Sequence, residues 1–177
     1  MMKRFLFALV IALFWFNVIA APDSTAIAEK PVQLKTVKAG KFTFSYTIDG
    51  KNLKGSVSVK TNGWVAIGFN PKNVMKDANI IIGTLVDGKP FLSDDFGDEL
   101  FSHRPDTSIG GTYNILAGDF RQESGIATMT FTIPLDSGDP KDAKLVPGQK
   151  VKLIFSTGAT FDIKKKHKSD ASTTITL

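Results

Sequence analysis

The first signal along the chain is a strict alternation of apolar and polar positions. In residues 41–48 every second side chain, from Phe42 to Ile48, is apolar, and the side chains between them are polar. Successive side chains of a strand point to opposite faces of a sheet, so this pattern predicts a half-buried β-strand. A turn signal at residues 49–52 follows, and the alternation resumes over residues 53–59. The two segments therefore predict two successive strands.

Continuous apolar runs at residues 64–69 and 79–86 are bounded by turn residues and predict core strands. Shorter strands are expected at residues 112–116, 126–133, 151–155 and 173–177. Residues 72–78 and 139–145 are each expected to form at most one short helical turn. Short strands with a turn signal about every ten residues predict an all-β protein, either an antiparallel sandwich or a barrel.

The N-terminal segment has the pattern of a secretory signal peptide. Lys3 and Arg4 precede an apolar run, and Val18-Ile19-Ala20 supplies small-residue cleavage chemistry. We expect residues 1–20 to be the signal peptide, residues 21–34 a flexible lead-in, and residues 35–177 the folded domain. The apolar run is short for a membrane span, which needs roughly 20 residues, although an uncleaved anchor is an alternative. The expected location is secreted or periplasmic, without stable membrane insertion after cleavage.

Composition excludes several chemistries. The chain has 177 residues and no cysteine, which rules out an iron–sulfur cluster, a thiolate zinc site, a thiol nucleophile and covalent c-type haem. The formal net charge of +5 falls by two, to +3, when Lys3 and Arg4 leave with the signal peptide. Much of the remaining positive charge lies in residues 164–168, a run that is usually a solvated loop. We expect no nucleic-acid partner for an exported protein.

Few soft metal ligands remain after residue 20. Met129 is in phase with the apolar face of its expected strand and is interpreted as core, whereas Met75 lies in a loop between two core strands. His103 and His167 both lie in polar loops, and neither belongs to a local metal motif.

A dense acidic stretch offers a different kind of site. Its members are Asp94, Asp95, Asp98 and Glu99. Hard cations such as calcium bind to clusters of this kind, but no EF-hand spacing is present and an acidic β-turn is the commoner structure. The residues alone predict a β-sandwich or barrel with a candidate soft-ligand site.

Two blocks of sequence add a family resemblance. Residues 63–69, with Trp64 and Phe69, are followed by Met75 and then by residues 76–83; this block resembles the most recognisable segment of the DOMON family. Residues 131–139 and 151–158, followed by His167, resemble that family too. The resemblance covers roughly residues 35–177 and implies an immunoglobulin-like antiparallel β-sandwich that binds haem or sugars.

The cytochrome-type members of this family imply a set of site residues. Met75 and His167 match the axial haem ligands and are the expected metal ligands, and Trp64 and Phe69 are expected to help bind the cofactor. Lys165, Lys166 or Lys168 is an alternative to His167, because some relatives ligate haem through lysine. The cofactor implied is noncovalent haem b. With both axial positions filled, one-electron transfer is favoured over oxygen activation.

The resulting hypothesis is an exported b-type haem domain that exchanges electrons with a redox partner protein, or senses haem or redox state, and is not itself an enzyme. A second hypothesis is a haem-free carbohydrate- or ligand-binding module, for which Tyr113 and Trp64 are the candidate stacking aromatics. A third is a structural or adhesive sandwich. A red purified protein with a Soret band would favour the first hypothesis over both others.

Overall fold

The computed structural model describes residues 33–177, which form two antiparallel β-sheets packed face to face. The expected signal peptide and residues 21–32 of the expected lead-in lie outside the described residues. The first sheet has the strand order β1-β2-β3-β9-β8. Its strands are β1 (Lys35–Ala39), β2 (Phe42–Asp49), β3 (Asn52–Lys60), β9 (Ile126–Pro134) and β8 (Ala117–Glu123).

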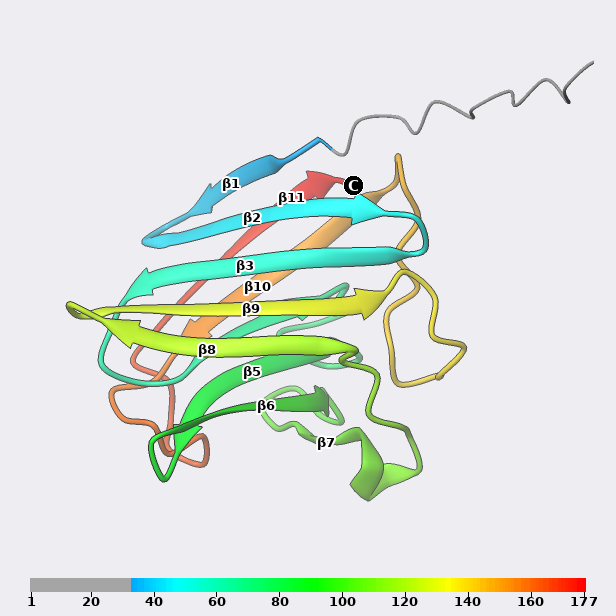
Figure 1. Ribbon diagram of the computed structural model, residues 1–177. Helices are drawn as coiled ribbons and strands as arrows, with labels where there is room; N and C mark the ends of the chain where they lie inside the picture. Colours follow the sequence, from blue (N-terminus) through cyan, green and yellow to red (C-terminus); the bar gives the residue numbers. More distant parts are fainter. Residues whose placement is uncertain (1–32) are drawn as a thin grey trace, which may run out of the picture. The chain divides into compact units, whose positions relative to one another are not determined.

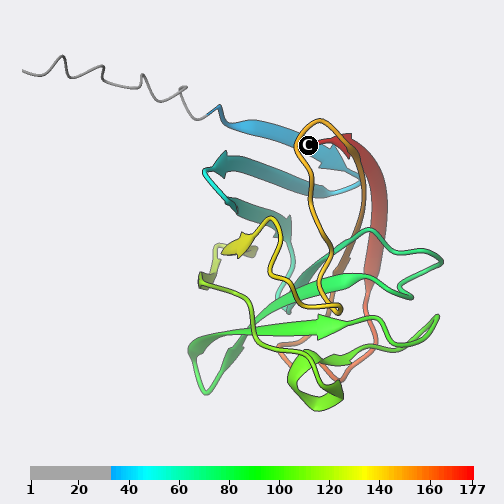
Figure 2. The same cartoon turned by 90° about the vertical axis from the view of Figure 1, so that its right-hand side faces the viewer.

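The second sheet has six strands in the order β11-β10-β4-β5-β6-β7. Its strands are β11 (Ser169–Thr176), β10 (Lys150–Thr157), β4 (Val65–Phe69), β5 (Asn79–Val86), β6 (Lys89–Phe96) and β7 (Arg104–Pro105). Figure 1 shows strands of the first sheet crossing in front of β10, and Figure 2 shows β9 (yellow) and β11 (red) on opposite sides of the sandwich. The predicted all-β antiparallel sandwich is confirmed.

An aromatic cluster fills the space between the two sheets. Phe44 on β2 is fully buried and stacks on Phe131, with 6.4 Å between ring centroids. It also contacts Phe69 and Phe155 of the opposite sheet at 6.5 and 6.1 Å. The alternation noted over residues 41–48 is therefore the alternation of core and surface positions on β2.

Several local predictions need correction. Residues 112–116 do not form a strand, and the strand of this region is β8, which begins at Ala117. Residues 72–78 and 139–145 form turns rather than helical turns, and the helical element among residues 33–177 is the 3₁₀ helix η1 (Asp106–Ile109). The acidic stretch begins inside β6, because Asp94 and Asp95 pair with Ile81 and Ile80 of β5. Carboxylates are depleted in strands, so their tertiary partners must decide this placement.

The central part of the second sheet, at β4 and β5, carries apolar residues on both faces. Its inner face contributes to the main core, while its outer face carries a second, separate group of buried apolar residues. These are Trp64, Ala66, Ala78, Ile80 and Ile82. Among residues 33–177 there is no helix of a length and hydrophobicity that would span a membrane. The outer face of the second sheet is the surface on which we place the candidate site.

Candidate functional site

A pocket of about 650 Å³ lies on the outer face of the second sheet. Its floor is made by side chains of β4, β5 and β10 and the residue before β4, namely Trp64, Ala66, Gly68, Ile80, Ile82 and Ile154. Residues from three loops, two more residues of β10 and one of β11 complete the lining, namely Val74, Met75, Phe101, His103, Phe155, Ser156, Ile163, Lys164, Lys165, Lys166, His167 and Asp170. The size is within the range of roughly 300–1,000 Å³ that is usual for small-molecule and cofactor sites.

The floor is apolar because the outward-facing residues of β4 and β5 that reach the pocket are apolar, namely Ala66, Gly68, Ile80 and Ile82. A continuous apolar run can bury both faces of a strand, and here one face lines the core and the other lines the pocket. Gly68 lets the side chains of Ile154 and Ile80 pack closely against β4. A Cβ atom at this position would lie 2.7 Å from Cγ1 of Ile154 and 3.3 Å from Cγ1 of Ile80.

Met75 lies in the loop between β4 and β5, and backbone hydrogen bonds hold this loop. The Ala78 N–H donates to the Met75 carbonyl at 3.0 Å, and the Asp77 N–H donates to the Gly97 carbonyl at 2.7 Å. Val74 adopts a left-handed conformation with φ of 50°, which is costly for a β-branched residue. The surrounding contacts therefore fix the loop in a conformation that its own sequence does not favour, and they place Met75 at the pocket.

Gly97 is the residue against which this loop packs. A Cβ atom at Gly97 would lie 1.8 Å from the carbonyl oxygen of Met75, a distance no structure can tolerate. We expect Gly97→Ala to displace the Met75 loop and to alter every ligand-dependent signal of the pocket, while the fold of the two sheets persists. Absorption spectroscopy with added haem, alongside far-ultraviolet circular dichroism, is the measurement.

Gly88→Ala is the matched control for this prediction. Gly88 lies in the turn between β5 and β6, and nothing lies within 4 Å of a Cβ atom built on it. Its φ of 74° adds local backbone strain without touching the pocket. If Gly97→Ala and Gly88→Ala give the same spectrum as the parent protein, the Met75 loop does not depend on Gly97.

His167 approaches the same pocket from the loop between β10 and β11. Its side chain is 38% exposed, and its Nδ1 lies 4.0 Å from Oδ1 of Asp170. The loop is tied down beside it, because the Lys168 N–H donates to the Thr157 carbonyl at 2.7 Å. Lys164, Lys165 and Lys166 line the pocket with His167, so this side carries a concentration of positive charge.

His103 lines the pocket as well, and it is oriented by a buried carboxylate. Its Nδ1 lies 2.7 Å from Oδ2 of Asp95, whose side chain is only 3% exposed. The Ser93 hydroxyl donates to the other oxygen of Asp95. Nearby, hydrogen bonds from Ser102 and Arg104 hold the pKa of Asp98 below its usual range. The Asp98 carboxylate therefore stays ionised and stabilises the loop that carries His103. A carboxylate behind an imidazole is typical of metal-binding histidines.

The sequence profile of the DOMON domain family matches residues 38–158, most of the chain. The chain belongs to the DOMON domain family. Met75 lies inside the matched residues, and His167 lies beyond them.

Curated relatives match a shorter stretch of this DOMON domain. DBH-like monooxygenase protein 1 of Mus musculus is 37% identical over 57 residues, and its Homo sapiens counterpart is 33% identical over 57 residues. In both cases the match covers 32% of this chain and 9% of the relative, so the chain spans less than a tenth of the length of these proteins.

Solved structures to which this chain is similar include two cytochrome domains. The cytochrome domain of Myriococcum thermophilum cellobiose dehydrogenase has a TM-score of 0.53 at 11% identity, with 81% of each chain covered. The cytochrome b domain of Coprinopsis cinerea pyranose dehydrogenase has a TM-score of 0.48 at 12% identity, with 76% of this chain and 75% of that chain covered. At this identity the first likeness establishes the fold.

The DOMON pocket includes three of the four residues expected at the site. Met75, His167 and Trp64 all line it. Phe69 does not, and this expectation needs correction. Phe69 is an odd number of positions from Trp64 on an extended segment, so its side chain points to the core, where it is 1% exposed.

Trp64 is itself largely buried. The side chain is 6% exposed, and its Nε1 is buried without a hydrogen-bond partner. It packs against Gly158, where a Cβ atom would lie 2.2 Å from Nε1. Gly97 was not predicted to be part of the site, and His103, a candidate ligand by residue type, was not assigned to it. No spacing in the sequence singles them out, because their roles come from the packing of loops that are distant along the chain.

Proposed function

We propose that this DOMON domain binds haem b noncovalently in the pocket of the second sheet, where Met75 and His167 would hold the iron, and serves one-electron transfer. The observation that carries the proposal is that Met75 and His167, from loops far apart in the sequence, line one apolar pocket. The fold that the chain shares with the cytochrome domain of a cellobiose dehydrogenase is in keeping with it.

The residues of the pocket fit this cofactor chemically. A thioether and an imidazole are both established ligands of haem iron, and the floor of Trp64 and the isoleucines offers an apolar surface to a flat macrocycle. The lysines of the 164–166 segment are placed to pair with carboxylate groups at the rim. When bound, the haem would supply an iron centre that changes its charge by one electron.

Each group of residues has a separate task in this proposal. Met75 and His167 would hold the iron from two different loops, and the Met75 thioether would favour its ferrous state. Ile80, Ile82 and Ile154 exclude water from the site. Because Met75 and His167 would both be engaged in holding the iron, we propose an electron-transfer or sensing domain rather than an enzyme.

The identity of the nitrogen ligand has rivals within the same pocket. Lys165 and Lys166 line it beside His167 and remain alternatives. His103 is a further candidate, because its hydrogen bond with Asp95 gives it the orientation of a metal ligand. We keep His167, since the family resemblance places the ligand there.

A redox partner protein and an exported location complete the proposal. The lysine-lined rim at residues 164–166 would attract an acidic surface on the partner and speed their encounter. If residues 1–20 act as the expected signal peptide, the reaction would take place in a secreted or periplasmic setting.

The haem-free carbohydrate-binding alternative has less support. A stacking platform requires exposed aromatic faces, but Trp64 is buried at 6% exposure. Tyr113 is 52% exposed and lies beside the half-exposed Phe91 at a shallow depression. This pair is the surface to test if the protein takes up no haem.

The test is uptake and release of haem. The purified protein should bind added haem at one equivalent and show a Soret band, and acidified organic solvent should extract all of the haem because the chain has no cysteine. A colourless protein that leaves added haem in solution would reject the proposal and favour the carbohydrate-binding alternative. Haem that stays attached to the polypeptide would contradict the b-type assignment.

A further inference from the structure

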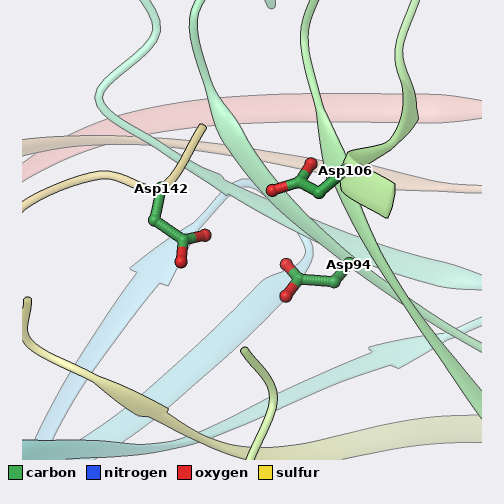
Figure 3. Close-up of side chains that lie close together, drawn as sticks. All are labelled: Asp94, Asp106 and Asp142. Atoms are coloured by element: carbon green, nitrogen blue, oxygen red, sulfur yellow. The ribbon is translucent and has the colours of Figure 1, made fainter. Parts of the chain in front are cut away.

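Three aspartates meet in the interior at one edge of the sandwich, away from the residues that line the pocket. Asp94 comes from β6, Asp106 begins η1, and Asp142 comes from the loop between β9 and β10. Carboxylate oxygens of the three lie within 4.8 Å of one another. Figure 3 shows the three carboxylate groups turned toward a common centre from three separate segments.

The burial of this cluster is what makes it unusual. Asp94 is 4% exposed and Asp106 is 1% exposed, while Asp142 is half-buried. None of the ion pairs found among residues 33–177 involves any of the three. Buried carboxylates without a positive partner are costly, so these groups need either protons or a cation. In the metal-free protein, burial and the neighbouring carboxylates raise the pKa of Asp94 to about 7 and that of Asp106 to about 8.

Buried oxygens without a hydrogen-bond donor distinguish a binding site from a cluster whose members satisfy one another's hydrogen bonds. Both carboxylate oxygens of Asp106 are buried and have no hydrogen-bond partner. In addition, Asn79, at the start of β5, is 4% exposed, and its Oδ1 is also buried without a partner. The Asn79 Nδ2 donates to Oδ1 of Asp142 at 2.7 Å, which places this amide against the cluster. The cluster thus presents oxygen acceptors that nothing in the described part of the chain satisfies.

The donor set selects the kind of ligand. The atoms of these four side chains that could bind a cation are oxygens, from three carboxylates and the Asn79 amide, with no histidine or cysteine among them. Calcium binds six to eight oxygen ligands in adaptable geometry, and carboxylate and amide oxygens are its usual ligands in proteins. Zinc favours nitrogen and sulfur ligands in structural sites.

We propose that Asp94, Asp106, Asp142 and Asn79 form a binding site for a hard divalent cation, Ca²⁺ above all. The cation would fasten η1 and the loop between β9 and β10 to the start of β5 and the end of β6. Asp94 is adjacent to Asp95, and alternation along β6 sends the two side chains to opposite faces. The cation site therefore lies behind the strand whose other face holds His103 in the pocket.

The experiment measures Ca²⁺ binding to the purified protein after treatment with EDTA, and it is independent of whether haem is bound. Titration calorimetry with calcium chloride should show one site per chain, and calcium should raise the thermal midpoint above that measured in EDTA. Asp106→Asn and Asp142→Asn should each weaken binding by more than about tenfold, the loss seen even for outer partners of metal sites.

Asp87→Asn is the matched control. Asp87 is exposed in the turn of the β5–β6 hairpin with φ of 51°, a conformation that asparagine also tolerates, so the variant removes one carboxylate charge outside the cluster. It should bind calcium as the parent protein does. Circular dichroism establishes that each variant is folded, and if Asp106→Asn does not fold, the half-buried Asp142→Asn decides.

Two results would overturn the proposal. One is a parent protein that shows no binding heat and no change in thermal midpoint up to roughly 10 mM calcium, above the weakest class of protein calcium sites. This outcome would mean that protons neutralise the cluster. The other is calcium binding that survives in Asp142→Asn, or that is lost equally in Asp87→Asn, since either would place the cation elsewhere.

Discussion

Replacing His167 by Ala should weaken haem retention at least about tenfold, and this is the largest functional effect that we expect from a single substitution. The imidazole is the stronger of the two proposed axial ligands, and His167 lines the pocket from a loop that offers no second histidine. Haem transfer to an excess of apomyoglobin measures the retention directly. A His167→Ala protein that remains six-coordinate and low-spin would shift the assignment to a neighbouring lysine.

Met75→Ala should act differently, on the potential more than on retention. The loss of the thioether opens one axial position and lowers the reduction potential, since methionine ligation stabilises ferrous iron. The near-infrared sulfur-to-iron charge-transfer band of the oxidised protein should disappear. If this band persists, Met75 is not the ligand, and Met129 has to be considered despite its fully buried position in the core.

His103→Ala is the decisive control for the nitrogen ligand. We expect it to leave the spectrum of the oxidised protein unchanged, although His103 lines the same pocket and is oriented by Asp95. If His103→Ala releases haem and His167→Ala retains it, the two histidines exchange roles. Lys166→Ala, beside His167, separates a lysine ligand from both histidines.

The largest effect on stability is expected at Phe44. Phe44 is fully buried between the sheets and contacts aromatic rings of both, so Phe44→Ala would leave a cavity that rigid strands cannot close. Substitutions of this kind lower the free energy of unfolding by about 3–5 kcal/mol. Urea denaturation of the haem-free protein, followed by circular dichroism, measures the change.

Phe101→Ala is the matched control for the core substitution. Phe101 is 79% exposed, so the same change of side chain there should alter the free energy of unfolding by less than about 0.5 kcal/mol. A Phe44→Ala protein as stable as the Phe101→Ala protein would contradict the central place that we give to Phe44 in the core.

Sequence patterns determined the fold class because a strand that is buried on one face alternates between apolar and polar residues, and a strand that is buried on both faces is a continuous apolar run. The alternation from Phe42 to Ile48 became β2, and the apolar runs at residues 64–69 and 79–86 became the two central strands β4 and β5. The same patterns did not predict β6, because the carboxylates of Asp94 and Asp95 are typical of loops. Their burial depends on partners from other segments, such as His103 and the backbone of Asn114.

The sequence predicted some of the residues that line the candidate site. The family resemblance selected Met75, Trp64 and His167, and all three line one pocket. It also selected Phe69, which the strand directs into the core instead. Consecutive residues of the matching segment include side chains of both faces of the strand, whereas in the folded sheet these side chains point in opposite directions.

Tertiary structure alone decided the two features that depend on distant loops. Gly97 fits against the carbonyl of Met75, and His103 joins the pocket, because the loop after β6 folds beside the loop after β4. Likewise Asp94, Asp106 and Asp142 become a cluster when η1 and the loop after β9 meet the end of β6. Alternation records whether a residue is buried, but it does not record which distant residue lies against it, and that pairing is fixed by how the sheets and their loops pack.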